Sequence, residues 1–226
     1  MSKVDPSHIA MNATPELEAR YSRASIGRFS LYLRCALRLQ AEGKQTVSSK
    51  QLGEALTISD AQVRKDLAEL GHLGHRGVGY PIRELIAALR AVLGVDRTWS
   101  VLVVGAGNLA RALLRYRGFQ QQGFHIVSLF DADPNKIGQH IEGLAIQPIS
   151  DLTEFVRNSG AELAMLTVPA EVAQDVADQL VDAGIRGILN FAPAVLRLPS
   201  SVRLIAVDLA VQLEQLASLV HLGNGE

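Results

Sequence analysis

The sequence predicts an α/β protein of two domains, a small helical domain followed by a larger domain with a mostly parallel sheet. Residues from about 22 to 94 show helical periodicity interrupted by polar and glycine turns. After Gly94, short β-branched runs alternate with helical stretches, which is the pattern of strands joined by crossover helices. The length of 226 residues, of which 48% are hydrophobic, is sufficient for one large or two modest cores.

Composition narrows the classes of protein that fit. The only cysteine is Cys35, which excludes an internal disulfide framework and any multi-cysteine metal site. No signal-like segment is visible at the N-terminus, and every apolar run is shorter than the ~18 residues of a membrane-spanning helix. We therefore expect a cytoplasmic protein with no membrane partner, and we interpret Cys35 as a buried, inert thiol.

The net charge of −1 hides an asymmetry between the two halves. Residues 1–97 contain 14 Lys and Arg against 10 Asp and Glu, whereas residues 98–226 contain 8 against 13. A basic half joined to an acidic half indicates that only the first half meets a polyanion.

The helical half begins with residues 1–20, which lack a sustained period and which we interpret as a mobile arm. A first amphipathic helix starts near Ser22 and ends before Gly43. Ser48 or Ser49 can cap a second, short helix, and Ser59 with Asp60 can cap a third. Residues 55–59 between these two short helices have the length of the turn in a helix-turn-helix.

The third helix carries groove-reading residue types near its start, and the glycine-rich stretch 71–80 that follows fits a hairpin-like wing. The alternative is that these polar residues are only the solvated face of a surface helix. The caps, turn, wing and positive charge together favour a winged helix on double-stranded DNA. We assign DNA contacts to Ser49, Gln62, Arg64, Lys65, His75, Arg76 and Gly77.

The second half begins with a glycine-rich turn between a predicted strand and a predicted helix. The run Gly105–Ala110 follows an apolar strand and opens a helix, as in a dinucleotide-binding turn. The helix amides would hold a pyrophosphate, and Ala110 occupies a helix–strand packing position that tolerates alanine. Asp131 ends the next strand, where a carboxylate accepts from a ribose hydroxyl and repels a 2′-phosphate. This favours NADH and NAD+ over their phosphorylated forms; a merely structural turn and CoA binding remain the alternatives.

Further strands are expected at 145–149, 163–168, 187–190 and 204–207, with helices at 151–158 and 171–183. A last helix, 209–222, has an apolar stripe to bury.

His72 and His75 lack a third ligand nearby, so no metal site is expected. Asp208 before the last helix can act simply as its cap.

In order and spacing, the chain from about Arg23 resembles the Rex family of bacterial redox-sensing transcriptional repressors. The segments that carry the resemblance are Ser48–Leu52, Ala61–Leu67, Arg76–Tyr80, Val104–Ala110, Tyr116 with Gly118–Phe119, Phe130–Pro134, Val168–Glu171, Gly187–Pro193 and Val207–Ala210. Ala68-Glu69-Leu70 departs from the Ser-Tyr-Phe common in the family, which puts operator affinity or operator sequence in question.

The resemblance implies a winged helix joined to a Rossmann domain in a homodimer whose C-terminal helices swap between subunits. Members bind palindromic operators and release them when NADH binds, so no catalysis is implied. The glycine turn and the acid after the next strand already give the cofactor contacts Gly105, Ala106, Gly107, Asn108, Leu109, Ala110 and Asp131. The resemblance adds contacts to the nicotinamide end from Val168, Pro169, Asn190, Phe191 and Pro193, with Leu209 contributed by the partner subunit. Arg34, Tyr116 and Asp208 would form a polar link between the operator-binding domain, the cofactor and the partner subunit.

The expected domains are the arm 1–20, a winged-helix domain 21–82, a Rossmann domain 83–208 and a dimerisation helix 209–226. An NAD-dependent oxidoreductase with an accessory domain is one alternative. However, about 130 residues after Arg97 are used up by a nucleotide-binding sheet, and no acid–base pair is evident. A DNA-binding protein that holds NAD(H) only as a structural cofactor is the other alternative.

Overall fold

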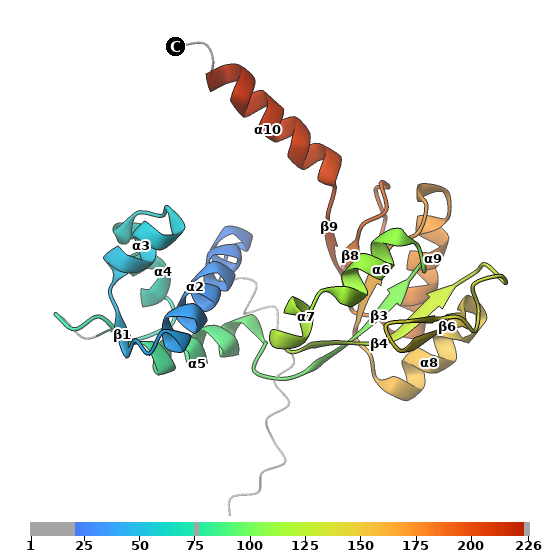
Figure 1. Cartoon of the computed structure of the whole chain (residues 1–226), viewed down its shortest axis with the longest axis horizontal. Helices are drawn as coiled ribbons and strands as arrows, with labels where there is room; N and C mark the ends of the chain where they lie inside the picture. The colour runs from blue at the N-terminus through green and yellow to red at the C-terminus, as the bar shows by residue number, and fades with distance from the viewer. Residues whose placement is uncertain (1–20, 75–76, 224–226) are drawn as a thin grey trace, which may run out of the picture. The chain divides into compact units, whose positions relative to one another are not determined.

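The computed structural model describes residues 21–74 and 77–223 (Figure 1). The chain forms two compact units, residues 1–96 and 97–226, and each is described by itself. The arm expected at 1–20 lies outside the described residues. Within the described ranges, no helix is long and apolar enough to cross a membrane.

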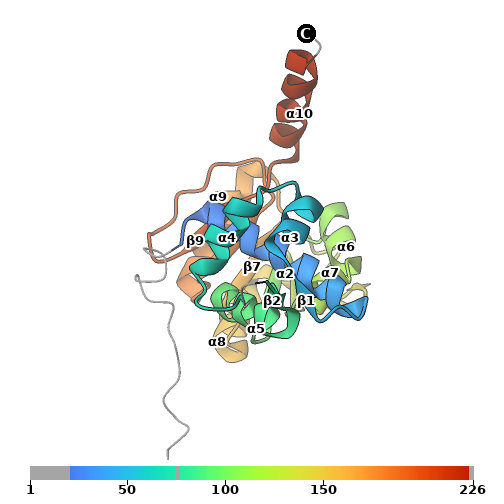
Figure 2. The same ribbon diagram turned by 90° about the vertical axis from the view of Figure 1, so that its left-hand side faces the viewer.

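The first unit is a helical domain with a two-stranded sheet (Figure 2). Its elements are α2 (Arg23–Ala41), β1 (Thr46–Val47), α3 (Ser49–Leu56), α4 (Asp60–Ala68), β2 (Tyr80–Pro81) and α5 (Ile82–Leu93). One apolar core joins the four helices, with Phe29, Leu52, Leu67 and Leu85 all fully buried. The helix-turn-helix expected from the sequence is formed by α3 and α4.

Local hydrogen bonds explain where these helices begin. Ser48 caps α3 in a capping box, because its hydroxyl accepts from the Gln51 amide while the Gln51 side chain accepts from the Ser48 amide. Ser59 caps α4, because its hydroxyl accepts a hydrogen bond from the backbone amide of Gln62. Gly53 lies within α3, and a Cβ on it would lie 2.5 Å from the carbonyl oxygen of Ile58 in the turn that follows, so the close approach of this turn to α3 requires glycine.

The wing differs from the expected hairpin. In the described part of 71–80, only Tyr80 lies in a strand, and β2 pairs antiparallel with β1, which precedes α3. The strand that pairs with the end of this segment therefore comes from before α3 and not from within residues 71–80 as described. Gly79, at a φ of +94°, passes so close to the Val47 carbonyl that a Cβ would lie 2.6 Å from its oxygen.

The boundary between the units also differs from the one expected after residue 82. Helix α5 belongs to the first unit, because Ile82, Leu85 and Leu89 are buried in the same cluster as Phe29 of α2. The compact units divide after Asp96. Helical periodicity places α5 correctly but does not say which core buries its apolar face.

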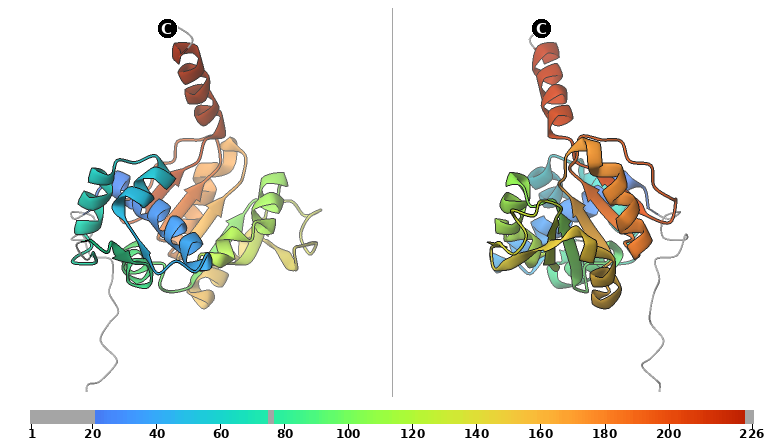
Figure 3. Two further views of the ribbon diagram at one scale, coloured as in Figure 1. Left: turned by 60° about the vertical axis from the view of Figure 1, so that its left-hand side comes forward. Right: turned by 90° about the vertical axis from the view of Figure 1, so that its right-hand side faces the viewer.

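The second unit is a seven-stranded sheet with helices on both faces (Figure 3). Its strands are β3 (Trp99–Val104), β4 (Phe124–Asp131), β5 (His140–Ile141), β6 (Leu144–Pro148), β7 (Leu163–Leu166), β8 (Gly187–Asn190) and β9 (Arg203–Ala206). Its helices are α6 (Asn108–Arg115), α7 (Gly118–Gln121), η1 (Ile149–Asp151), α8 (Leu152–Ser159), α9 (Ala170–Ala183) and α10 (Leu209–Gly223).

The strand order is β5-β6-β4-β3-β7-β8-β9, and every pair is parallel except β5 with β6. Side chains of β3 alternate between two cores: Leu102 and Val104 pack with α8 and α9, whereas Val101 and Val103 pack with Ala110 of α6. The chain leaves β3 in one direction along the sheet and returns to β7 on its other side. The carboxyl ends of β3 and β7 therefore flank the topological switch point, where doubly wound sheets bind ligands.

Candidate nucleotide and nucleic-acid sites

The glycine turn after β3 lies at this switch point and is locked to the end of β7. Gly105 has a φ of +101°, and a Cβ there would lie 2.6 Å from the Thr167 carbonyl oxygen. The Thr167 hydroxyl donates to the carbonyls of Val104 (3.0 Å) and Gly105 (2.7 Å). The backbone of the turn is thus fixed from both sides, and only glycine fits at position 105.

The next residues open towards solvent at the N-terminus of α6. Gly107 is the N-cap, and a Cβ on it would meet no atom within 4 Å. Asn108 and Leu109 are exposed, whereas Ala110 is fully buried. The first amides of a helix have no intrahelical acceptor and carry partial positive charge, so this end of α6 can hold a phosphate.

Asp131, at the end of β4, ties this turn to the neighbouring strand. One carboxylate oxygen accepts from the Ala106 amide (2.7 Å) and the Lys136 ammonium (2.9 Å), and the other accepts from the Asp133 amide (2.8 Å). Burial raises the pKa of this carboxyl, but the hydrogen bonds from Asp133, Lys136 and Ala106 outweigh it and hold the pKa below its usual value. Asp131 is therefore ionised at neutral pH.

These contacts change how the turn can bind a nucleotide. The Ala106 amide already serves Asp131, so it is not available to a pyrophosphate, and the amides from Gly107 onward remain. Three hydrogen bonds occupy the carboxylate, which has about four acceptor positions. The Asp131 carboxylate thus has room for one further donor, such as a ribose hydroxyl.

On the other side of the switch point, Asn190 is the last residue of β8, and its side chain holds the loop that follows. Its side chain is buried and donates to the carbonyls of Ala192 and Ala194, both at 3.1 Å, while its oxygen accepts from the Ala192 amide at 2.9 Å. The amide group is used up in shaping the loop after β8. Within that loop Phe191 is half-buried and Pro193 is exposed.

Val168 and Pro169 follow β7, where Val168 is half-buried beside Gly105 and Pro169 is exposed before α9. The expected cofactor residues therefore all lie at or just after the carboxyl ends of the adjacent parallel strands β4, β3, β7 and β8.

The residues of the expected polar link are each described within their own unit. Tyr116 is 55% exposed and packs edge-on against Phe119, with 5.0 Å between ring centres. Asp208 accepts from the Ala210 amide at 2.9 Å and so caps α10. Arg34 is exposed on α2, in the other unit.

On α4, Arg64 and Lys65 are exposed, as a reading face requires. The Arg64 guanidinium contacts the Asp60 carboxylate at 2.6 Å and the Ser49 hydroxyl at 3.4 Å. Gly77 has a φ of +82°, while His75 and Arg76 lie outside the described residues.

Gln62 does not share the exposed face of Arg64 and Lys65. It is half-buried, and its amide donates to Asp66 at 2.7 Å. Asp66 is 1% exposed and also binds Arg28 and Tyr32 of α2. Sequence reasoning missed this cluster; the only signal was an acid at a position that the helical period places inside.

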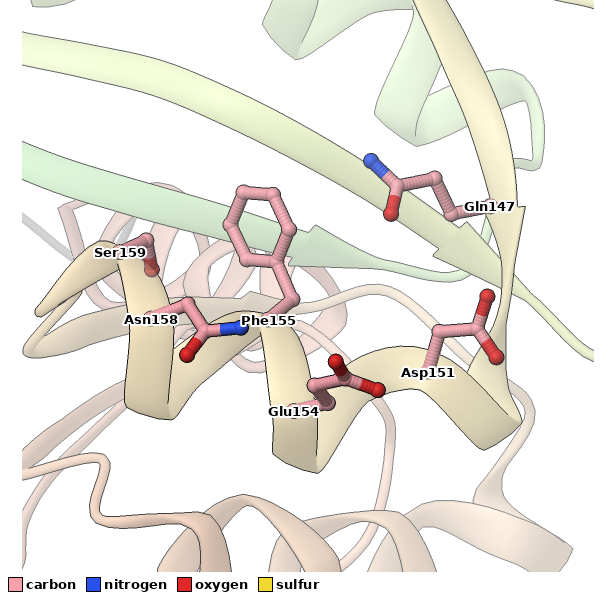
Figure 4. A pocket seen from close by; sticks show the side chains of 6 residues that line it. All are labelled: Gln147, Asp151, Glu154, Phe155, Asn158 and Ser159. Atoms are coloured by element: carbon pink, nitrogen blue, oxygen red, sulfur yellow. The ribbon is translucent and has the colours of Figure 1, made fainter.

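A pocket away from the glycine turn lies beside α8 (Figure 4). It has a volume of about 500 Å³ and is lined by Gln147, Asp151, Glu154, Phe155, Asn158 and Ser159. Two of these are acids, which disfavour a phosphate, and none belongs to the glycine turn. The described residues also contain no group of three or more His, Cys, Asp and Glu side chains that could hold a metal ion. Cys35 is buried.

The fold and the two sites define a class of protein in which a helix-turn-helix unit is joined to a Rossmann-type unit. A model described as a CoA binding domain matches residues 96–194, and a model of a putative DNA-binding protein N-terminus matches residues 21–68. A redox-sensing transcriptional repressor Rex from Carboxydothermus hydrogenoformans is 49% identical over 85% of this chain and 93% of its own. One from Desulfitobacterium hafniense is 45% identical over 85% and 92%.

Among solved structures, the repressor RSP in complex with β-NAD+ and operator DNA is 32% identical, with a TM-score of 0.86 over 90% of this chain and 94% of that chain. RSP in complex with β-NADH gives a TM-score of 0.81 at 31% identity. The chain belongs to the Rex family of redox-sensing transcriptional repressors.

Proposed function

We propose that this protein is a transcriptional repressor that binds operator DNA through its first unit and NADH or NAD+ through its second. The observation that carries the proposal is that one chain combines an exposed basic face on α4 with a glycine turn and an acid at a switch point. The relative RSP, whose solved complexes contain operator DNA, β-NAD+ and β-NADH, supports the same assignment. The curated relatives of this chain are named as repressors rather than enzymes.

The residues at the switch point fit a dinucleotide. The open side of Gly107 admits a pyrophosphate to the end of α6, and Asp131 can accept from the adenosine ribose. A bound nicotinamide would supply the redox state that is sensed. The loop held by Asn190 would lie beside it and, between Asn190 and Pro193, offers no proton-transfer group, which fits sensing rather than hydride catalysis.

CoA is the second candidate ligand, because the matching family model is named for it. CoA carries a phosphate on its adenosine ribose, which the ionised, buried Asp131 would repel. The same argument disfavours NADPH. The proposal therefore commits to NADH and NAD+.

The proposed assembly is a homodimer through α10, the dimerisation helix of the expected 209–226 segment. The stripe of Leu209, Leu213, Leu216 and Val220 is more than half exposed at every position, and a second copy of the chain would bury it. We further propose that Arg34, Tyr116 and Asp208 link the operator-binding unit, the cofactor and the partner subunit. Cytoplasmic localisation follows from this function.

Calorimetric titration with NADH, NAD+, NADPH and CoA tests the ligand assignment. Saturable binding of NADH and NAD+ with no binding of NADPH or CoA is the expected result. A mobility-shift assay with a duplex from the gene's own upstream region, against a scrambled duplex of the same composition, tests the DNA assignment. Preference for CoA, or equal binding of both duplexes, would contradict the proposal.

A further inference from the structure

Asp66 of α4 is the centre of a buried polar cluster in the first unit. Its carboxylate accepts from the Arg28 guanidinium at 2.5 and 2.8 Å, from the Tyr32 hydroxyl at 2.8 Å and from the Gln62 amide at 2.7 Å. Asp66 and Tyr32 are essentially inaccessible to solvent, at 1% and 0% exposed. Four hydrogen bonds saturate the acceptor positions of the carboxylate.

A buried carboxylate is tolerated only when it is paired and hydrogen-bonded. Burial alone raises the pKa of Asp66, but the hydrogen bonds from Arg28, Tyr32 and Gln62 together hold it below its usual value. The group is therefore charged at neutral pH, and every partner that stabilises the charge is fixed in place by it.

The cluster joins two helices that are distant in sequence. Arg28 and Tyr32 lie on α2, and Asp66 lies on α4, 38 and 34 residues further along. Val63 and Leu67 of α4 also face the core, but apolar contacts are non-directional and leave a helix some freedom to rotate and slide. The Arg28–Asp66 pair is bidentate, which defines both the rotation and the axial position of α4.

The same cluster separates the polar side chains of α4 into a buried set and an exposed set. Gln62 is held against Asp66, whereas Arg64 and Lys65 remain on the exposed face. A change in the rotation of α4 would move Arg64 and Lys65 relative to base edges, where each well-formed contact distinguishes bases by geometry.

We propose that Asp66 is a positioning residue for sequence recognition: by clamping α4 to α2, it sets the orientation in which Arg64 and Lys65 are presented to the operator. This inference rests on the proposed DNA-binding function. Asp66 itself does not touch DNA, so its removal should affect discrimination between sequences more than general attraction to DNA.

The test compares Asp66→Asn with Glu54→Gln in the full-length protein. Both variants remove one negative charge from the first unit, but Glu54 is exposed on α3 and pairs only loosely with Lys50 at 3.9 Å. Fluorescence anisotropy at fixed salt gives Kd for the gene's upstream duplex and for a scrambled duplex. Tyr32→Phe removes a single hydrogen bond and serves if Asp66→Asn fails to fold.

We expect Asp66→Asn to lower the ratio of the two affinities by about tenfold, the size of one lost base-specific contact, with little change in Kd for the scrambled duplex. Tyr32→Phe should lower the ratio by a smaller factor, and Glu54→Gln should leave it unchanged. A ratio in Asp66→Asn or Tyr32→Phe that stays within twofold of the parent protein, at equal folded fraction, overturns the inference.

Amide hydrogen exchange, measured without DNA, separates this inference from the proposed function. Residues 60–68 should exchange faster in Asp66→Asn and in Tyr32→Phe than in the parent, while residues 49–56 exchange at the same rate. Unchanged exchange in α4 overturns the inference even if the parent protein binds its operator. A parent protein that does not discriminate between duplexes contradicts the proposed function, and the exchange result still decides the role of Asp66.

Discussion

The amide of Ala106, in the glycine turn, donates a hydrogen bond of 2.7 Å to the carboxylate of Asp131 at the end of the neighbouring strand. The two ends of the proposed dinucleotide site, the phosphate turn and the ribose acceptor, are therefore one hydrogen-bonded unit. A change at Asp131 should affect both.

Replacement of Asp131 by Asn should weaken NADH binding by about tenfold, since one charge-assisted hydrogen bond contributes on that scale. NADPH, which the charged Asp131 repels, should gain affinity relative to NADH. Calorimetric titration of both nucleotides measures the ratio, and Asp151→Asn, an exposed acid outside the site, is the matched control. An unchanged ratio of NADPH to NADH affinity would show that Asp131 does not select the ribose.

Asp131 should also make the second unit sensitive to acid. Its pKa is lowered in the folded state, so its ionised form stabilises the fold above its unfolded pKa of about 4. That stabilisation is lost as the pH falls through the folded value. Urea unfolding followed by the fluorescence of the single tryptophan, Trp99, should show a midpoint that drops from pH 6 to pH 3, and drops less in Asp131→Asn. Parallel pH profiles for the two proteins would contradict this assignment.

Gly105 and Gly107 should behave differently when each is replaced by alanine. Gly105→Ala forces a Cβ against Thr167 at a positive φ and should destabilise the second unit by roughly 1–3 kcal/mol. Gly107→Ala meets no protein atom, so stability should be retained, but the methyl group would occupy the path of a pyrophosphate and weaken NADH binding. Thermal unfolding and NADH titration of both variants separate the two effects. Normal NADH affinity in Gly107→Ala would argue against phosphate binding at this turn.

The exposed apolar stripe of α10 predicts a dimer that a single charge disrupts. Leu216→Glu should shift the protein from dimer to monomer in sedimentation equilibrium, because burying an unpaired carboxylate is costly. Ser218→Glu, on the side of the same helix opposite the stripe, should leave the dimer intact. A Leu216→Glu protein that remains dimeric would place the interface elsewhere.

Local signals in the sequence were sufficient for most of the fold. The first helix starts at Ser22 as expected, Ser48 rather than Ser49 caps the second and Ser59 caps the third. The β-branched run after Trp99 forms the central strand. Caps and β-branched runs depend only on neighbours within a few residues, so they can be recognised from the sequence. The α/β fold with two domains, which was predicted from them, is confirmed. The roles of the individual site residues stay predictions.

Tertiary contacts account for what the sequence did not reveal. Asp66 meets Arg28 and Tyr32 across more than 30 residues, so no local pattern marks the cluster. The same cluster draws in Gln62, which was expected on the reading face. The side-chain amide of Asn190 likewise forms hydrogen bonds with the backbone of the following loop. These bonds depend on the conformation of the loop, which the neighbouring sequence does not specify.

The central claim, that the redox state of the nucleotide controls operator binding, is tested most directly by one titration. A labelled duplex from the gene's own upstream region is held with the protein at fixed salt while NADH or NAD+ is added, and anisotropy reports the bound fraction. We predict loss of binding with NADH and retention with NAD+, since only a ligand with different affinities for the two states shifts their populations. Equal operator affinity with NADH, with NAD+ and with neither would contradict the account and leave the nucleotide a purely structural role.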